Sequence, residues 1–114
     1  MAYVYSVSCD LSRTRDYSRL HDALKDLDAW WHYLESTWLV VSDKTADDLW
    51  SLIQSQIGPK DRILIVRLTN DYSGFLPDEA WDWIREHLAA APGINPAATA
   101  PARNQPVVSP ALTR

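Results

Sequence analysis

Two aspartates carry the side chains in this sequence that are best suited to metal chemistry. Asp10 follows residues 2–9 (AYVYSVSC), which alternate in the manner of a strand, and Asp43 follows a second strand-like segment, residues 37–41 (TWLVV). We expect these two strands to run parallel at the centre of one sheet, with both carboxylates at the same edge. Carboxylate oxygens are ligands that Mg²⁺ or Mn²⁺ accepts, and a metal held there would activate water for phosphodiester cleavage.

Basic residues follow Asp10 closely. Arg13 and Arg15 lie in the polar segment after the first strand, and Arg19 comes shortly after them. Guanidinium groups bind phosphate oxygens through charge-assisted hydrogen bonds, and a small basic cluster raises the local concentration of anions. The sequence therefore predicts that Arg13 and Arg15 bind phosphate beside a metal held by Asp10 and Asp43.

A purely structural interpretation accounts for the same residues. Asp10 is suited to capping its own loop through an Asx-type turn, and Asp43 is suited to the approach to the helix that Thr45 caps. The histidines show no metal-ligand spacing: His21 is expected at a helix boundary and His32 within a strand. Both the catalytic and the structural interpretations stay open from the sequence alone.

Composition narrows the class of protein. A chain of 114 residues and 13.0 kDa has room for one domain. The formal net charge of −4 disfavours an extended clamp on duplex DNA. The single Cys9 excludes an internal disulfide framework and fits the cytoplasm, and no apolar run approaches the ~20 residues that cross a bilayer. We therefore expect a cytoplasmic protein without a membrane partner.

The C-terminal segment differs in composition from the rest of the chain. Residues 91–114 hold five of the seven prolines, separated mainly by small and polar residues. Repeated prolines prevent regular ladders, and so few large apolar side chains bury too little surface to offset the entropy of ordering. The sequence predicts a folded domain over residues 1–90 and a disordered Pro/Ala-rich tail over residues 91–114.

Hydrophobic periodicity in the first 90 residues predicts four strands and three helices. The strands are expected at 2–9, 30–34, 37–41 and 62–68, with helices at about 17–27, 45–57 and 77–88. The resulting order, βαββαβ plus a C-terminal helix, is that of the α+β ferredoxin-like split βαβ fold. That fold has a four-stranded antiparallel sheet, with the first and third strands central and two helices on one face.

The other face of that sheet needs a cover. It is expected to carry Ser6, Ser8, Ile63 and Ile65, together with part of the tryptophan-containing strands. So much apolar surface does not stay exposed to water, and either the third helix or a second subunit would cover it. We predict a homodimer, in which the six tryptophans serve as core and interface residues.

Three segments resemble known families. YVYSVSCDLSRTRDYSRLHDAL resembles the opening of the small CRISPR-associated adaptation nucleases, where a strand ends in Asp and basic residues follow, and DRILIVRL resembles their late strand. WWHYLESTWLVVSDKTADDL is more similar to proteins of the SinR family, and VapD-type toxin ribonucleases belong to the same broad group. The resemblance covers residues 2–90. It implies a ferredoxin-like dimer with facing sheets, in which Asp10 of each subunit matches the family's metal-binding Asp.

Two functions follow as hypotheses. The first is a homodimeric binding or interaction module with no catalysis or a degenerate site. The second is a divalent-metal-dependent endoribonuclease that uses Asp10 of both subunits, with Asp43 as a secondary ligand and Arg13 and Arg15 on phosphate. The first requires no cofactor and the second requires Mg²⁺ or Mn²⁺, and RNA or a nucleotide is the ligand considered.

Overall fold

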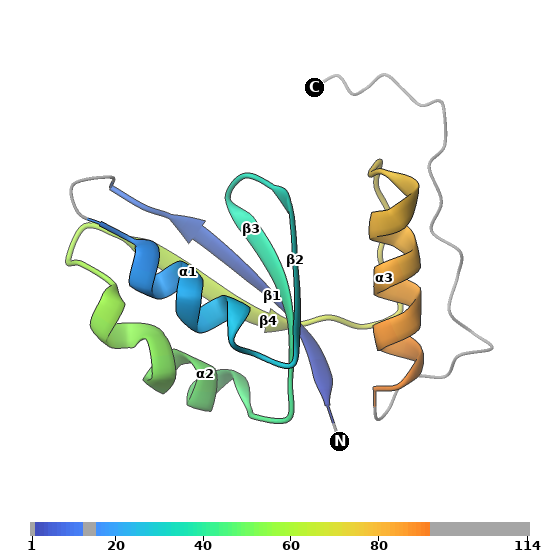
Figure 1. The fold of residues 1–114 in the computed structure, drawn as a ribbon, viewed down its shortest axis with the longest axis horizontal. Coiled ribbons are helices and arrows are strands. Elements are labelled where there is room, and N and C mark those ends of the chain that lie inside the picture. The colour runs from blue at the N-terminus through green and yellow to red at the C-terminus, as the bar shows by residue number, and fades with distance from the viewer. Residues whose placement is uncertain (1, 13–15, 92–114) are drawn as a thin grey trace.

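The computed structural model describes residues 2–12 and 16–91, which form one sheet and three α-helices (Figure 1). The elements are β1 (Tyr3–Asp10), α1 (Ser18–Lys25), β2 (Ala29–Leu34), β3 (Thr37–Ser42), α2 (Ala46–Ile53), the short 3-10 helix η1 (Gln54–Gln56), β4 (Arg62–Arg67) and α3 (Asp78–Ala89). None of the described helices has the length and apolarity that a membrane crossing needs. Arg13, Arg15 and residues 92–114 of the predicted tail lie outside the described residues.

The strands form one four-stranded sheet in the order β2-β3-β1-β4. Each neighbouring pair is antiparallel, so the predicted antiparallel α+β sheet is confirmed. The arrangement is compatible with a ferredoxin-like fold. The central positions of β1 and β3 also match the prediction, but their relative direction does not: they are antiparallel rather than parallel.

Local sequence signals account for several element boundaries. Thr45 and Asp48 form a capping box at the start of α2: Asp48 N donates to Thr45 Oγ1 at 3.1 Å, and Thr45 N donates to Asp48 Oδ2 at 3.3 Å. Glu35 and Ser36 form the turn that joins β2 to β3. The predicted second helix is shorter than expected, because regular α-helix stops at Ile53 and η1 follows.

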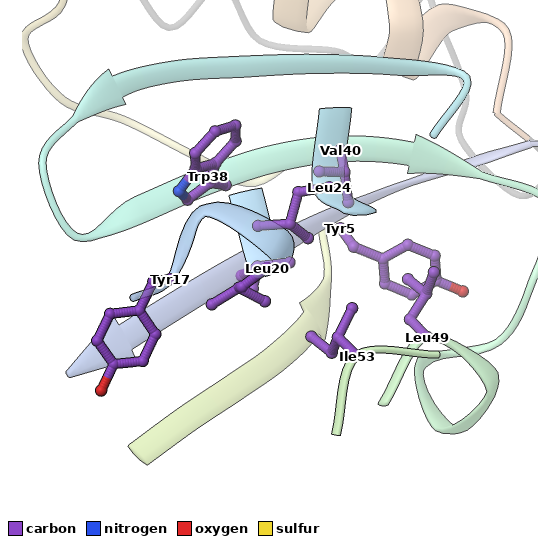
Figure 2. Close-up of a cluster of buried hydrophobic side chains, with 9 residues drawn as sticks. Tyr5, Tyr17, Leu20, Leu24, Trp38, Val40, Leu49 and Ile53 are labelled. Carbon is purple, nitrogen blue, oxygen red and sulfur yellow. The ribbon is translucent and has the colours of Figure 1, made fainter. Parts of the chain in front are cut away.

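The first part of the core lies between the sheet and the helices α1 and α2, which cover the same face (Figure 1). Figure 2 shows α1 contributing Leu20 and Leu24, and α2 contributing Leu49 and Ile53, to a cluster with strand residues. Trp38 belongs to this cluster and is only 3% exposed. Because all of these side chains are apolar or aromatic and buried, their burial is the main stabilising contribution on this face.

The second part of the core lies on the opposite face, under α3. One side of this cluster comes from the sheet and the other from the helix: Val4, Trp31, Leu39 and Val41 pack with Ala80, Trp81, Ile84 and Leu88. Trp31 Nε1 also donates a hydrogen bond to the carbonyl oxygen of Ala80 at 3.4 Å. The helix α3 therefore covers part of the face that α1 and α2 leave uncovered.

The remainder of this second face stays exposed. Ser6 pairs with Val66 and Ser8 with Leu64 across the β1–β4 ladder, and paired residues share a face. Leu64 is 62% exposed and Val66 is 47% exposed. We call Ser6, Ser8, Leu64 and Val66 the open face.

The residues of β4 that lie on the open face differ from those predicted from the sequence. Ile63 and Ile65 were expected beside Ser6 and Ser8, but both pack against the cluster under α1 and α2. Residues 62–68 are apolar on both faces, so the sequence did not determine the phase of this strand. The register with β1 determines it.

Replacing Leu88 tests the packing of α3 onto the sheet. Leu88 is 0% exposed, so Leu88→Ala is expected to lower the free energy of unfolding by about 2–5 kcal/mol. Chemical denaturation followed by circular dichroism measures this change. The control is Leu52→Ala on α2, where Leu52 is 47% exposed and the expected change is within about 0.5 kcal/mol. Equal effects of the two substitutions would contradict the described packing of α3.

Candidate functional site

A cleft of about 490 Å³ lies at the end of the sheet where β1 finishes and the β2–β3 turn begins. Its lining comes from the end of β1, the start of the α1 region and the β2–β3 hairpin, and comprises Cys9, Asp10, Leu11, Tyr17, His21, His32, Glu35, Ser36 and Trp38. The backbone closes this end of the sheet, because Cys9 N donates to the Ser36 carbonyl oxygen at 2.8 Å. Titratable side chains from distant parts of the sequence therefore meet in one concave site.

Aromatic stacking organises one wall of this cleft. The ring of His32 stacks on Trp38 with centroids 4.0 Å apart and planes 12° apart, and His21 stacks on Trp38 at 5.4 Å and 29°. The imidazole Nε2 of His32 is 3.0 Å from the Glu35 carbonyl oxygen, which fixes the ring against the hairpin turn. The two histidines, predicted to be unremarkable boundary and strand residues, thus flank a buried tryptophan.

His21 has an altered acidity in this position. Burial lowers the pKa of His21 below its usual 6.5, and the neighbouring His32 and Lys25 lower it further. The carboxylates of Asp22 and Asp16 act in the opposite direction but do not cancel the shift. The shift favours the neutral form of the His21 imidazole.

Asp61 holds together the chain segments that border the cleft. Its Oδ1 accepts hydrogen bonds from Ser12 N and from the Tyr17 hydroxyl, both at 2.7 Å, and its Oδ2 accepts one from Gly58 N at 2.8 Å. The hydrogen bonds from Tyr17, Ser12 and Gly58 hold the pKa of Asp61 well below its usual 3.8. The carboxylate joins the β1–α1 segment to the segment that precedes β4.

Sequence reasoning missed Asp61 as an important carboxylate. Its partners Ser12 and Tyr17 are 49 and 44 positions away in the chain, so no local pattern indicates them. The only local signal is the Gly58-Pro59 pair shortly before it, which indicates a turn there without indicating what the aspartate binds.

The predicted pairing of Asp10 with Asp43 is wrong. Asp10 is the last residue of β1, whereas Asp43 follows Ser42, which pairs with the first residue of β1, Tyr3. The two carboxylates therefore lie at opposite ends of the β1–β3 ladder. The reason is topological: the tight hairpin makes β3 antiparallel to β2, and β3 lies between β2 and β1, antiparallel to both.

Asp10 and Asp43 of one chain do not form the predicted metal site, because they lie at opposite ends of the β1–β3 ladder. Among residues 2–12 and 16–91, no three His, Cys, Asp or Glu side chains are grouped so as to hold a metal ion. Asp10 remains at the cleft, opposite Arg62 in the β1–β4 ladder, while Asp43 is remote from it. The predicted phosphate ligands Arg13 and Arg15 lie outside the described residues.

Cys9 also lines the cleft, but it is not suited to nucleophilic chemistry. Burial, with a further contribution from the Asp61 carboxylate, raises the pKa of the Cys9 thiol to about 11. Almost none of it is thiolate at neutral pH, and the thiolate is the reactive form. Cys9 is therefore not expected to act as a nucleophile in this cleft.

Comparison with protein-family models, with curated proteins and with solved structures gives no match to this chain.

Acid titration of an Asp61 variant tests the role of this carboxylate. Because the folded-state pKa lies below 3.8, the stabilisation is present above that pH and is lost as the pH falls below it. Asp61→Asn should therefore lower the melting temperature at pH 7 by several degrees, and its deficit should shrink below pH 3.8. Calorimetry at a series of pH values measures both effects. Asp71→Asn, at an exposed site, serves as the control, and a constant Asp61→Asn deficit down to pH 2 would contradict the described hydrogen bonds.

Proposed function

We propose that this chain is a ferredoxin-like, split βαβ domain with α3 as an added helix, and that it forms a cytoplasmic homodimer that acts as a binding module. The observation that carries the dimer is the open face, where Leu64 and Val66 are 62% and 47% exposed. Two exposed apolar side chains on one face of the sheet favour burial against a partner. A second copy of the chain brings the same surface, which makes a two-fold interface self-complementary.

Further apolar residues extend the contact beyond the open face. Tyr33 packs edge-on against Trp31, with ring centroids 5.1 Å apart, and is 44% exposed. Trp31 belongs to the cluster under α3, so Tyr33 contacts a residue of that cluster. A stable interface buries about 800 Å² on each partner, which the open face reaches only together with such neighbouring residues.

The positions of the carboxylates support binding over catalysis. Asp61 is engaged in three hydrogen bonds that join chain segments, and Asp43 lies far from the cleft. Asp10 and Glu35 are the acidic residues of the described cleft lining. Among the described residues, these two carboxylates are not part of any group of three or more side chains that could hold a metal ion.

Light scattering with matched variants tests the dimer. The wild-type protein is expected at twice the chain mass of 13.0 kDa at micromolar concentration. The double variant Leu64→Asp, Val66→Asp should shift to the mass of one chain, because buried, unpaired carboxylates are strongly unfavourable. The control, Leu52→Asp, changes an exposed leucine on α2 and should leave the mass doubled. A wild-type mass of 13.0 kDa would refute the dimer.

An endoribonuclease that uses Asp10 of both subunits is the second candidate. The observation that favours it is alternation along β1, which assigns Asp10 to the face of Ser6 and Ser8, at the strand end. A dimer formed through that face would bring two Asp10 carboxylates toward one another. Mg²⁺ or Mn²⁺ would then be held between the subunits rather than by Asp10 and Asp43 of one chain.

Cleavage assays separate the two candidate functions. Single-stranded RNA would be incubated with the protein and Mg²⁺, Mn²⁺ or chelator. If the second candidate is right, metal-dependent cleavage is lost in Asp10→Ala and retained in Asp43→Asn, because Asp43 lies at the other end of the ladder. Cleavage that persists in Asp10→Ala would exclude the Asp10 mechanism, and no cleavage in any condition would favour the binding module.

A further inference from the structure

One edge of the sheet is open to a further strand. β4 is the last strand in the order β2-β3-β1-β4, so among residues 2–12 and 16–91 no strand lies on its outer side. At the opposite edge, the register between β2 and β3 shifts between Trp31 and Leu34, and such irregularities hinder pairing with another strand. β4 keeps a continuous register with β1 over Arg62–Arg67 and contains no proline. The edge of β4 is therefore the one suited to pairing.

The register determines which backbone groups of β4 point outward. Leu68 N donates to the Val4 carbonyl oxygen at 2.7 Å, which extends the β1–β4 ladder by one hydrogen-bonded pair. Because hydrogen-bonded and non-hydrogen-bonded pairs alternate along an antiparallel ladder, the residues at even positions of β4 bond to β1. The N–H and C=O groups of Ile63, Ile65 and Arg67 therefore point away from the sheet. They form a row of donors and acceptors that a further strand would satisfy.

Apolar side chains line both sides of this edge. On the open face, Leu64 and Val66 are exposed. On the helix-covered face, Ile63 and Ile65 border a groove of about 230 Å³, and its remaining lining comes from the start and middle of α2, namely Ala46, Asp47 and Trp50. A strand that is apolar on both faces is typical of the interior of a sheet rather than of its edge. An added strand would place its alternate side chains in the groove and beside the open face.

A second copy of β4 fits this edge in one register. A two-fold axis perpendicular to the sheet makes the two strands antiparallel and keeps both open faces on the same side. With the axis at Ile65, the outward backbone groups of Ile63 meet those of Arg67 in the second copy, and those of Ile65 meet their own symmetry mates. All the outward N–H and C=O groups of these three residues are then paired. The hydrogen bonds and the alternation of faces thus agree in a single arrangement.

The side chains are compatible with the same register. Each Leu64 lies beside Val66 of the other copy on the open face, which joins the exposed apolar side chains into one larger patch. Neither Arg62 nor Arg67 faces another arginine, so the pairing places no like charges opposite one another.

The groove offers the second copy a complementary charge. Arg67 lies over the Tyr3 ring, with Cζ 3.7 Å from the ring centroid, so its side chain follows the helix-covered face. In the paired register, Arg67 of one copy is opposite Ile63 of the other, which borders the groove together with Asp47. The Asp47 carboxylate would attract a guanidinium at that position, and the symmetry provides this contact twice. The occupant that this edge favours is therefore another β4.

From these features we propose that the edge of β4 pairs with β4 of a second copy of the chain, so that two sheets join into one continuous sheet. This contact goes beyond the proposed dimer and does not rest on it, because it uses backbone groups in the plane of the sheet rather than the open face. A strand of six residues offers a smaller contact than the about 800 Å² that each partner of a stable interface buries. The edge contact therefore forms at millimolar rather than micromolar concentration.

Hydrogen exchange of the backbone amides tests the pairing in the wild-type protein. The amides of Ile63, Ile65 and Arg67 should exchange about tenfold more slowly at millimolar than at micromolar protein concentration, because pairing occupies their outward N–H groups. The amides of Leu64 and Val66, which bond to β1, are the internal control and should be protected at both concentrations. Equal exchange of the three outward amides at both concentrations would overturn the proposal. A dimer through the open face alone leaves these amides unpaired, so the two contacts are distinguishable.

Substitutions at the symmetry axis identify the occupant. Ile65→Lys and Ile65→Glu should each abolish the slow exchange at Ile63 and Arg67, because like charges would face one another across the axis. An equimolar mixture of the two variants should restore it, because opposite charges then meet there. The control, Leu52→Lys, changes an exposed leucine of α2 outside the groove and should behave as the wild type. Slow exchange that persists in both single variants, or that the mixture does not restore, would overturn the pairing of β4 with β4.

Discussion

The antiparallel pairing of β1 with both of its neighbours is the constraint on which the rest of the structure depends. β1 is bonded to β3 on one side and to β4 on the other, in one continuous register on each side. Register determines faces, because paired residues project to the same side of a sheet. If the register between β1 and β4 shifted by one residue, Ile63 and Ile65 would take the exposed positions. Leu64 and Val66 would then face α1 and α2.

The same pairing determines which residues meet at each end of the sheet. At one end, the last residues of β1 approach the β2–β3 turn through the bond between Cys9 and Ser36, and this end forms the cleft. At the other end, Tyr3 pairs with Ser42, immediately before Asp43. Asp61 then attaches the α1 region and the segment before β4 to the cleft end by hydrogen bonds to a charged acceptor, which are stronger than neutral ones. The cleft is thus built on bonds between segments far apart in sequence.

The sequence predicted what depends on nearby residues. The helix cap at Thr45, the two-residue gap between the strands at 30–34 and 37–41, and the amphipathic helices all have signals within a few positions. Strand direction, the phase of β4 and the partners of Asp61 depend on residues tens of positions apart, which one sequence does not reveal. The stack of His32 and His21 on Trp38 likewise needs three separate elements in place. Asp10 and Asp43 lie apart because the hairpin with β2 reverses the direction of β3. The end of β3 therefore lies beside the start of β1 and not beside its end.

The open face and the cleft meet along β1, because Asp10 lines the cleft and alternates with Ser6 and Ser8 of the open face. The open face combines the exposed apolar side chains of Leu64 and Val66 with two serines, whereas the cleft is lined by aromatic and titratable side chains. Trp38 and Tyr17 of the cleft belong to the cluster under α1 and α2, whereas Leu64 and Val66 lie on the other side of the sheet. A dimer formed through the open faces would therefore place the Asp10 side of each cleft toward the interface. Subunit association would then alter the surroundings of one carboxylate in each cleft without touching the aromatic side chains that α1 and α2 cover.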